Sequence, residues 1–189
     1  MVDLSPGERT QIRSRLCFFR ATSDILGYGR FYSADPRFPC SIAVPGTPNF
    51  AYHRWDAQFL GVTFDIKDHE DVAVFRTDFK ELAEHDSLAG EIIRGRADEV
   101  TYAERFEHNS YRAGVSSRAH IRRRSGHIAG FVTHRVAYAN GWQRIFFMDS
   151  NYVMWNIHNR GIDDQTYVRI AASFGFLSRG YFTEIAELI

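Results

Sequence analysis

The pattern of apolar and polar residues changes several times along the chain and predicts a mixture of helices and strands. Residues 58–66, QFLGVTFDI, and 71–76 read as strands, and YVMWNI at 152–157 is expected to extend the same sheet. Residues 5–26, 77–94, 98–113 and 163–187 read as helical, the last with an interruption near 175–180. The segment 33–50 holds four of the 5 prolines and is expected to be mostly loop. The whole chain, 1–189, is therefore predicted to be one α+β domain, with a helix first and an antiparallel sheet late.

A hairpin is expected at about 128–149, where two alternating runs flank Asn140-Gly141. Asn-Gly between such runs is typical of a two-residue type I′ loop, because both of its central residues need positive φ. Counting outward from that loop places His134 opposite Phe147. The face that carries His134 is expected to point inward, because the other face carries two arginines, Arg135 and Arg144.

Asp149 follows Phe147 by two residues, so in this register it lies diagonal to His134 on the same face. A carboxylate at that position could hold the imidazole in one tautomer. A histidine and an aspartate near a strand end are also common as purely structural residues. A catalytic interpretation therefore requires a nucleophile elsewhere in the chain.

The composition indicates a folded chain without strong charge preference. The 189 residues carry a formal net charge of zero, with 16 Phe, 9 Tyr and 3 Trp, which is enough to bury a core without disulfides or metal. Neutrality argues against an overall polyanion binder, so no nucleic-acid partner is expected. No transmembrane segment or secretory signal is recognisable, and synthesis in a cytosol is expected. The spacing of the 8 histidines does not predict a metal site, and no cofactor motif is present.

Cys17 is the better candidate for a nucleophile among the 2 cysteines. A single cysteine with a histidine and an aspartate far downstream is typical of thiol hydrolases, because the three residues meet in space and not in sequence. Cys40 lies in the proline-rich segment, away from any helix N-terminus that would lower its pKa. Gln11, six positions before Cys17, could supply an oxyanion donor together with a backbone N–H. That role requires a helix break near Ser14.

The order Gln11, Cys17, His134, Asp149 resembles that of papain-like cysteine proteases. More narrowly, Cys17, His134 and the run FFMDSNYVMW resemble the YopT/AvrPphB-type effector proteases. The resemblance covers the start of the chain and about residues 130–155. It departs from that family in the residues beside Cys17 and in Thr133, which precedes the histidine, so His127, after Gly126, is a second candidate for the base.

The resemblance implies a papain-like fold, with an N-terminal helix carrying Cys17 packed on a C-terminal antiparallel sheet. It also implies a thiol hydrolase that cleaves a protein substrate, with Cys17 as nucleophile, His134 as base, Asp149 as orienting residue and Gln11 in the oxyanion hole. An effector of that type would be secreted or injected into a host cell. Two alternatives stay open: a deamidase or transglutaminase-type acyl transferase with the same residues, and a non-enzymatic binding domain.

Overall fold

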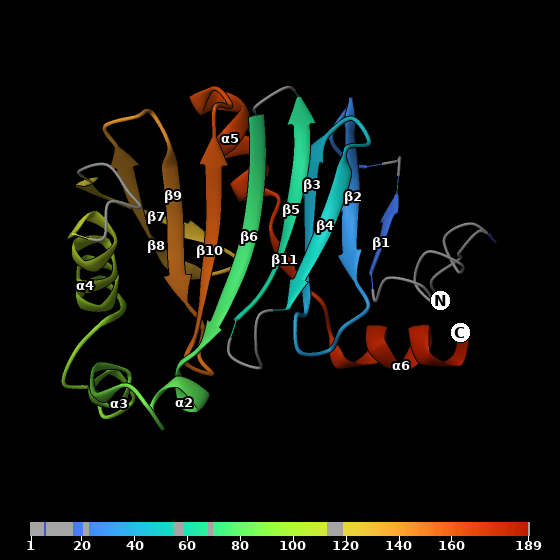
Figure 1. Cartoon of the computed structure of the whole chain (residues 1–189). Coiled ribbons are helices and arrows are strands. Elements are labelled where there is room, and N and C mark those ends of the chain that lie inside the picture. The colour runs from blue at the N-terminus through green and yellow to red at the C-terminus, as the bar shows by residue number, and fades with distance from the viewer. Residues whose placement is uncertain are drawn as a thin grey trace.

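The computed structural model describes Pro6 and residues 17–20, 23–54, 59–67, 70–112 and 119–188. Two antiparallel sheets and five labelled helices make up this part of the chain (Figure 1). The strands are β1 (Cys17–Arg20), β2 (Tyr28–Ser33), β3 (Cys40–Pro45), β4 (Asn49–Arg54), β5 (Phe59–Lys67), β6 (Glu70–Asp78), β7 (Ala119–Ile128), β8 (Phe131–Tyr138), β9 (Gln143–Met148), β10 (Val153–Arg160) and β11 (Gly175–Phe176). The helices are α2 (Phe79–Leu82), α3 (Ser87–Ile93), α4 (Glu99–Arg112), α5 (Asp164–Ala172) and α6 (Arg179–Leu188). The prediction of a mixed α+β chain with antiparallel sheets is confirmed.

The seven-stranded sheet, in the order β4-β5-β6-β10-β9-β8-β7, separates two hydrophobic cores. The larger core lies between this sheet, the four-stranded sheet β1-β2-β3-β11 and α5, and its fully buried side chains include Phe31, Val62 and Trp155. The smaller core lies on the opposite face, beneath α2, α3 and α4, and includes Phe79, Ala103 and Phe146. We call these the inner and the outer face of the seven-stranded sheet. Figure 1 shows α4 beside β8, whereas β4, β5 and β6 have no helix in front of them.

Aspartate side chains cap the N-termini of four helices. Asp78, Asp86 and Asp163 each accept a backbone N–H from the first turn of α2, α3 and α5, and Asp98 accepts from the amide of Thr101 in α4. Such caps satisfy amides that have no partner within a helix, and their negative charge suits the N-terminus. Two helical segments were expected at 77–94 and 98–113, and α2, α3 and α4 confirm both, although a turn separates α2 from α3. No helix in the described part of the chain is long and apolar enough to cross a membrane.

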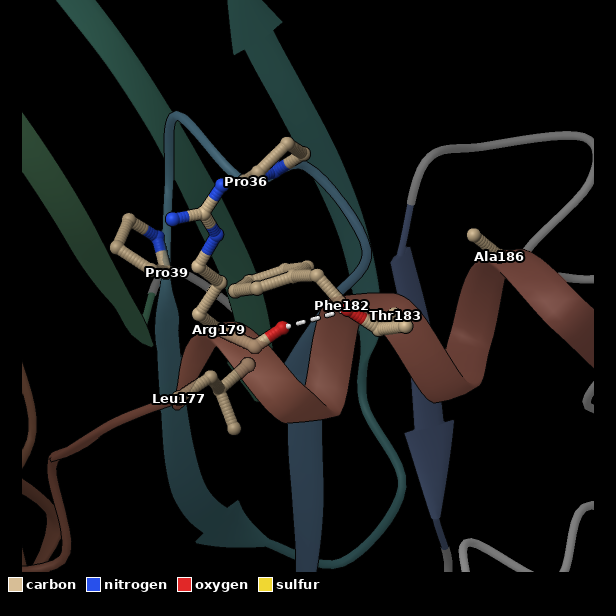
Figure 2. Close-up of a pocket in the computed structure, with 7 residues that line it drawn as sticks. All are labelled: Pro36, Pro39, Leu177, Arg179, Phe182, Thr183 and Ala186. Atoms are coloured by element: carbon tan, nitrogen blue, oxygen red, sulfur yellow. Dashed lines mark hydrogen bonds between the residues drawn. The ribbon is translucent and has the colours of Figure 1, made fainter.

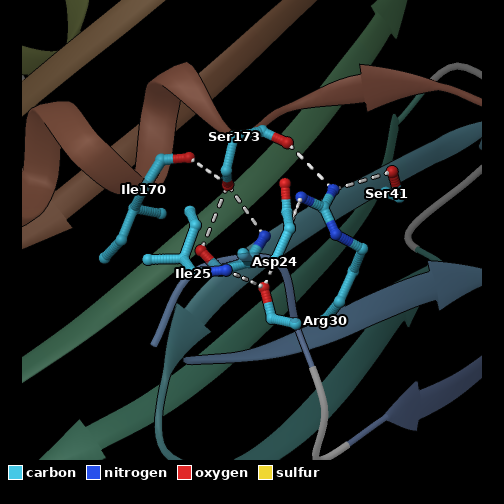
Figure 3. Close-up of polar contacts among 8 residues, drawn as sticks. Asp24, Ile25, Arg30, Ser41, Ile170 and Ser173 are labelled. Atoms are coloured by element: carbon cyan, nitrogen blue, oxygen red, sulfur yellow. Dashed lines mark hydrogen bonds and ion pairs between the residues drawn. The ribbon is translucent and has the colours of Figure 1, made fainter. Parts of the chain in front are cut away.

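A group of polar contacts ties α5 to the four-stranded sheet (Figure 3). The Ser173 hydroxyl, after the last turn of α5, accepts the amide proton of Ala43 at 2.8 Å and lies 2.6 Å from the carbonyl oxygen of Ile170. The Arg30 guanidinium donates to the Ser173 carbonyl at 3.2 Å and to Asp24 at 2.9 Å. Hydrogen bonding to Arg30 lowers the pKa of Asp24. These contacts fix the end of α5 against β2 and β3.

The predicted helix over residues 5–26 is wrong at its C-terminal part. Cys17–Arg20 forms β1 and pairs with β2, with Cys17 opposite Ser33. Gly27, expected to end the helix, instead adopts a φ of 78° in the turn that leads into β2. The two phenylalanines of CFFR favour a strand, and pairing with β2 stabilises that choice over local helical spacing. The papain-like placement of Cys17 on a helix is therefore not found.

The expected loop over 33–50 contains β3 and the start of β4. Pro39 directly precedes β3 and Pro45 is its last residue, positions where a missing amide proton does not interrupt a ladder. The prolines therefore mark the ends of strands here. The expectation that the sheet comes late in the chain is wrong, because β1 to β6 lie within residues 17–78. The strands predicted at 58–66 and 71–76 are confirmed by β5 and β6. The extension of the sheet by YVMWNI is confirmed by β10.

The hairpin of β8 and β9 exists, but its register differs by one residue from the prediction. His134 pairs with Phe146 and not with Phe147. The amide of Tyr138 donates to the carbonyl oxygen of Trp142 at 2.9 Å, which leaves a three-residue loop. Within that loop only Gly141 has a positive φ, of 85°, as in a type I turn followed by a bulge. A type I′ turn would also need a positive φ at Asn140, and Asn140 does not have one. The extra loop residue shifts the register by one, so β9 presents the opposite face to the one expected.

Candidate functional site

His134 and Asp149 lie on opposite faces of the seven-stranded sheet. The Nε2 atom of His134 is 3.0 Å from a carboxylate oxygen of Glu99 in α4, and its ring stacks on Phe146. Asp149 accepts the backbone amides of Asn151 and Val153 and the indole N–H of Trp155, the last at 3.0 Å. The predicted contact of His134 with Asp149 is therefore wrong, because the register places one residue under α4 and the other beside the inner core.

Cys17 lies on a strand far from the one that carries His134. Cys17 begins β1, an edge strand of the four-stranded sheet, and Figure 1 shows β1 and β8 at opposite ends of the molecule. Its side chain, Gln11 and the helix break near Ser14 lie outside the described residues. His127 is exposed in β7, opposite Val132. The roles proposed for Cys17 and Gln11 stay predictions.

Cys40 was expected to lie in an irregular loop. It is instead the first residue of β3 and is completely buried. Burial raises the pKa of its thiol well above the usual value. A buried neutral thiol is a packing residue and a poor nucleophile.

Unusual polar side chains lie instead on the outer face of β9 and β10. Arg144 is 3% exposed and Asn156 is 5% exposed, and His158 is the cross-strand partner of Arg144. These three residues occupy alternate positions on neighbouring strands, so their side chains project to the same side. Arginine and asparagine are rarely this deeply buried without a specific set of partners.

An ion pair holds Arg144 against α4. Its Nη2 atom lies 2.9 Å from Oε1 of Glu107, and the two side chains are 3% and 7% exposed. The hydroxyl of Tyr138 donates to the same carboxylate oxygen at 2.5 Å, and burial, with the bond to Glu107, raises the pKa of Tyr138. The guanidinium also lies 5.1 Å from the ring centre of Phe146. The charge of Arg144 is thus compensated within the protein.

Beside this ion pair is a cavity of about 220 Å³, at the place where α4 stops covering the sheet. Its walls are mainly apolar and aromatic, and its polar groups come from the outer face of the sheet. The lining residues are Phe75, Thr77, Tyr102, Phe106, Arg144, Met154, Asn156 and His158. Phe106 is 48% exposed, which places it at the rim. A mostly apolar hollow with a few convergent polar groups is the usual form of a small-molecule site.

Two buried polar atoms of the residues that line this cavity lack hydrogen-bond partners within the described residues. They are the Nε atom of Arg144 and the Oδ1 atom of Asn156, and Nη2 of Arg144 makes only the ion pair with Glu107. Leaving a buried polar group without a partner costs about 1–3 kcal/mol, and more for a charged group. Such groups are therefore expected to meet water or a ligand.

His158 contributes a neutral imidazole to the cavity. Burial, together with the positive charges of Arg144 and Arg160, lowers the pKa of His158 from 6.5 to about 3. The ring meets that of Phe75 edge to face, with centres 5.4 Å apart. At neutral pH it can both donate and accept one hydrogen bond.

Gly61 in β5 leaves the space that Phe75 occupies. A Cβ atom added to Gly61 would lie 2.2 Å from Cδ1 of Phe75, far inside van der Waals contact. Phe75 is the cross-strand partner of Gly61 on one side and of Asn156 on the other. The glycine therefore allows the ring to lie over β5, away from the polar groups of the cavity.

Two other hollows offer weaker candidates. A wide groove of about 560 Å³ runs between α6 and the segment before β3, and Figure 2 shows that Leu177 and Phe182 come from the region of α6 and Pro36 and Pro39 from the facing loop. Its lining is mostly apolar and does not define a ligand. A second hollow, of about 410 Å³, surrounds Arg30, whose guanidinium is already used in the contacts of Figure 3. Among the described residues, no three His, Cys, Asp or Glu side chains are arranged to hold a metal ion.

The cavity residues were not predicted from the sequence, although one signal was present. In VMWNIHNR the polar residues Asn156 and His158 alternate with apolar ones in a strand that is otherwise suited to burial. That alternation shows that one face of β10 is polar, but it does not show which helix covers it. Glu107, the partner of Arg144, could not be identified without the packing of α4.

No protein-family model matches this chain, and no curated protein matches it in sequence.

Proposed function

We propose that this chain is a binding domain for a small ligand, which it holds between α4 and the outer face of the seven-stranded sheet. The observation that carries the proposal is that Arg144 and Asn156, which line a cavity with aromatic walls, each have a deeply buried polar atom without a partner among the described residues. A domain built only for stability would gain by filling this space with apolar side chains.

The size of the cavity limits the ligand to about one substituted ring. An apolar cavity of roughly 150 Å³ can hold benzene, and the cavity here measures about 220 Å³. The rings of Phe75, Tyr102 and Phe106 supply flat apolar walls, which suit a planar ligand. Among the described residues that line this site, no nucleophile lies next to a base, and the proposal is therefore one of binding.

The thiol hydrolase acting on a protein substrate stays a prediction, as does secretion or injection into a host cell. A papain-like arrangement would need Cys17 and His134 to meet, and the fold described above does not favour it. The same holds for deamidation or acyl transfer by those residues.

Titration with toluene, followed by ligand-observed NMR, tests the proposed function. Thr77 lines the cavity and is 4% exposed, so Thr77→Phe should fill the space and abolish binding. Thr47→Phe introduces the same ring at an exposed position between β3 and β4 that lines none of the three hollows described above, and it is the matched control. Saturable binding to the unmodified chain and to the control, but not to Thr77→Phe, is expected. Equal binding to all three proteins would show that toluene binds elsewhere and would refute the proposal.

A further inference from the structure

The hydrogen-bonding groups of the cavity restrict the chemistry of its ligand, and this inference rests on the proposed function. Within the described part of the chain, the Nε–H donor of Arg144 and the Oδ1 acceptor of Asn156 are buried and have no hydrogen-bond partner. Rotation of the Asn156 amide exchanges its oxygen and nitrogen, so this side chain presents a donor and an acceptor side by side in either orientation. A complementary ligand must therefore carry both an acceptor and a donor.

The net charge of the site opposes an ionic ligand. Glu107 already compensates Arg144 at 2.9 Å, and burial keeps His158 neutral. A carboxylate ligand would satisfy Arg144 but would leave the acceptor oxygen of the Asn156 amide without a donor, and it would add a second negative charge near Glu107. A cationic ligand would satisfy Asn156 but would approach the guanidinium of Arg144. An unpaired charge in a buried site is strongly unfavourable.

We infer that the cavity binds a neutral planar ring that carries an amide-like group, with a carbonyl oxygen and an N–H on neighbouring atoms. Primary aryl carboxamides, lactams and the amide edges of heterocyclic bases belong to this class. The carbonyl oxygen would accept from Arg144 Nε, and the N–H would donate to Asn156 Oδ1. The ring would lie among Phe75, Tyr102 and Phe106, which line the cavity.

Four probes that share one ring and differ in one substituent test this inference on the unmodified chain. Benzamide is neutral with a donor and an acceptor, benzoate is anionic, benzamidine is cationic, and toluene has no polar group. Isothermal titration at pH 7 should give benzamide a dissociation constant at least ten-fold lower than that of each of the other three. A benzoate or benzamidine that binds as tightly as benzamide would overturn the inference.

Two outcomes separate this inference from the proposed function. Binding of toluene with no gain for benzamide would overturn the amide preference and leave the small-ligand function intact. Failure of both toluene and benzamide to bind would refute the function itself.

Asn156→Leu tests the role of the Asn156 amide. Leucine is similar in size to asparagine, and the cross-strand partners of position 156, Phe75 and Phe146, are apolar. The variant should lose the ten-fold advantage of benzamide over toluene. Benzamide that still binds ten-fold more tightly than toluene to this variant would contradict the assigned contact. The comparison of the four probes on the unmodified chain does not depend on how this variant folds.

Discussion

Replacing Glu107 by glutamine should destabilise the fold strongly, because it leaves the charge of Arg144 buried without a counter-charge. The two side chains are 3% and 7% exposed, and their charged atoms are 2.9 Å apart. Removing one member of a buried ion pair typically costs about 3–5 kcal/mol. This is a large part of the roughly 5–15 kcal/mol that stabilises an ordinary domain.

Urea denaturation followed by tryptophan fluorescence measures this effect, since Trp155 is 1% exposed in the larger core. With a urea slope of about 2–3 kcal/mol per molar, a loss of that size lowers the midpoint by roughly 1–2.5 M. The dependence of the unfolding free energy on urea concentration should stay unchanged if the variant is less stable but its native state is equally compact.

Two matched variants identify the cause. Glu107→Leu combined with Arg144→Met removes both charges and should recover most of the lost stability, because apolar residues of similar size often replace a buried pair without cost. Glu91→Gln disrupts the ion pairs with Arg94 and Arg96 at the surface and should leave the midpoint nearly unchanged. A Glu107→Gln variant as stable as the unmodified chain, or a double variant no more stable than the single one, would refute the assignment of a buried charge.

Three further changes have defined outcomes. Gly61→Ala should push the ring of Phe75 toward the cavity, weaken toluene binding, and cost about 1–3 kcal/mol by overpacking in a urea titration; unchanged binding would mean that the ring does not border the site. His158 has a folded-state pKa of about 3 against an ordinary 6.5, so the unfolded chain binds the proton first as pH falls, and stability present above pH 6.5 is lost on acidification. The unmodified chain should lose about 2 kcal/mol more than His158→Gln between pH 7 and pH 5, and parallel urea midpoints in the two proteins would contradict this. Iodoacetamide labelling of Cys17 should be the same in His134→Ala as in the unmodified chain; slower labelling at mildly acidic pH would instead support the predicted thiol hydrolase.

The sequence predicted those elements that are determined by local patterns. β5 and β6 have near-continuous apolar runs, and α4 begins at a capping aspartate. All three elements can therefore be predicted without knowledge of distant contacts. Residues 17–20 were predicted to be helical. They form β1 because they pair with β2, and this distant contact cannot be read from the local pattern. The prolines before and after β3 suggested a loop, although they only mark the ends of that strand.

The candidate site depended on features that a single sequence does not determine. Asn140-Gly141 suits both a two-residue loop and a three-residue loop, and the choice reverses the face of every residue in β9. His134 and Asp149 were thereby predicted to meet, whereas Arg144 was assigned to the other face. The pairing of Arg144 with Glu107 joins β9 to α4, and it follows only from how the helix packs on the sheet.

The most direct test of the binding cavity is an NMR measurement of contacts between ligand and protein. With methionine methyl groups labelled with ¹³C, the ε-methyl of Met154, which lines the cavity, can be compared with that of Met148, its cross-strand partner outside the lining. Bound toluene should give strong intermolecular nuclear Overhauser effects to Met154 and weak or no effects to Met148, and Thr77→Phe should remove them. Saturating toluene that gives no effect at Met154, or an equal effect at both methyl groups, would contradict the placement of a ligand in this cavity.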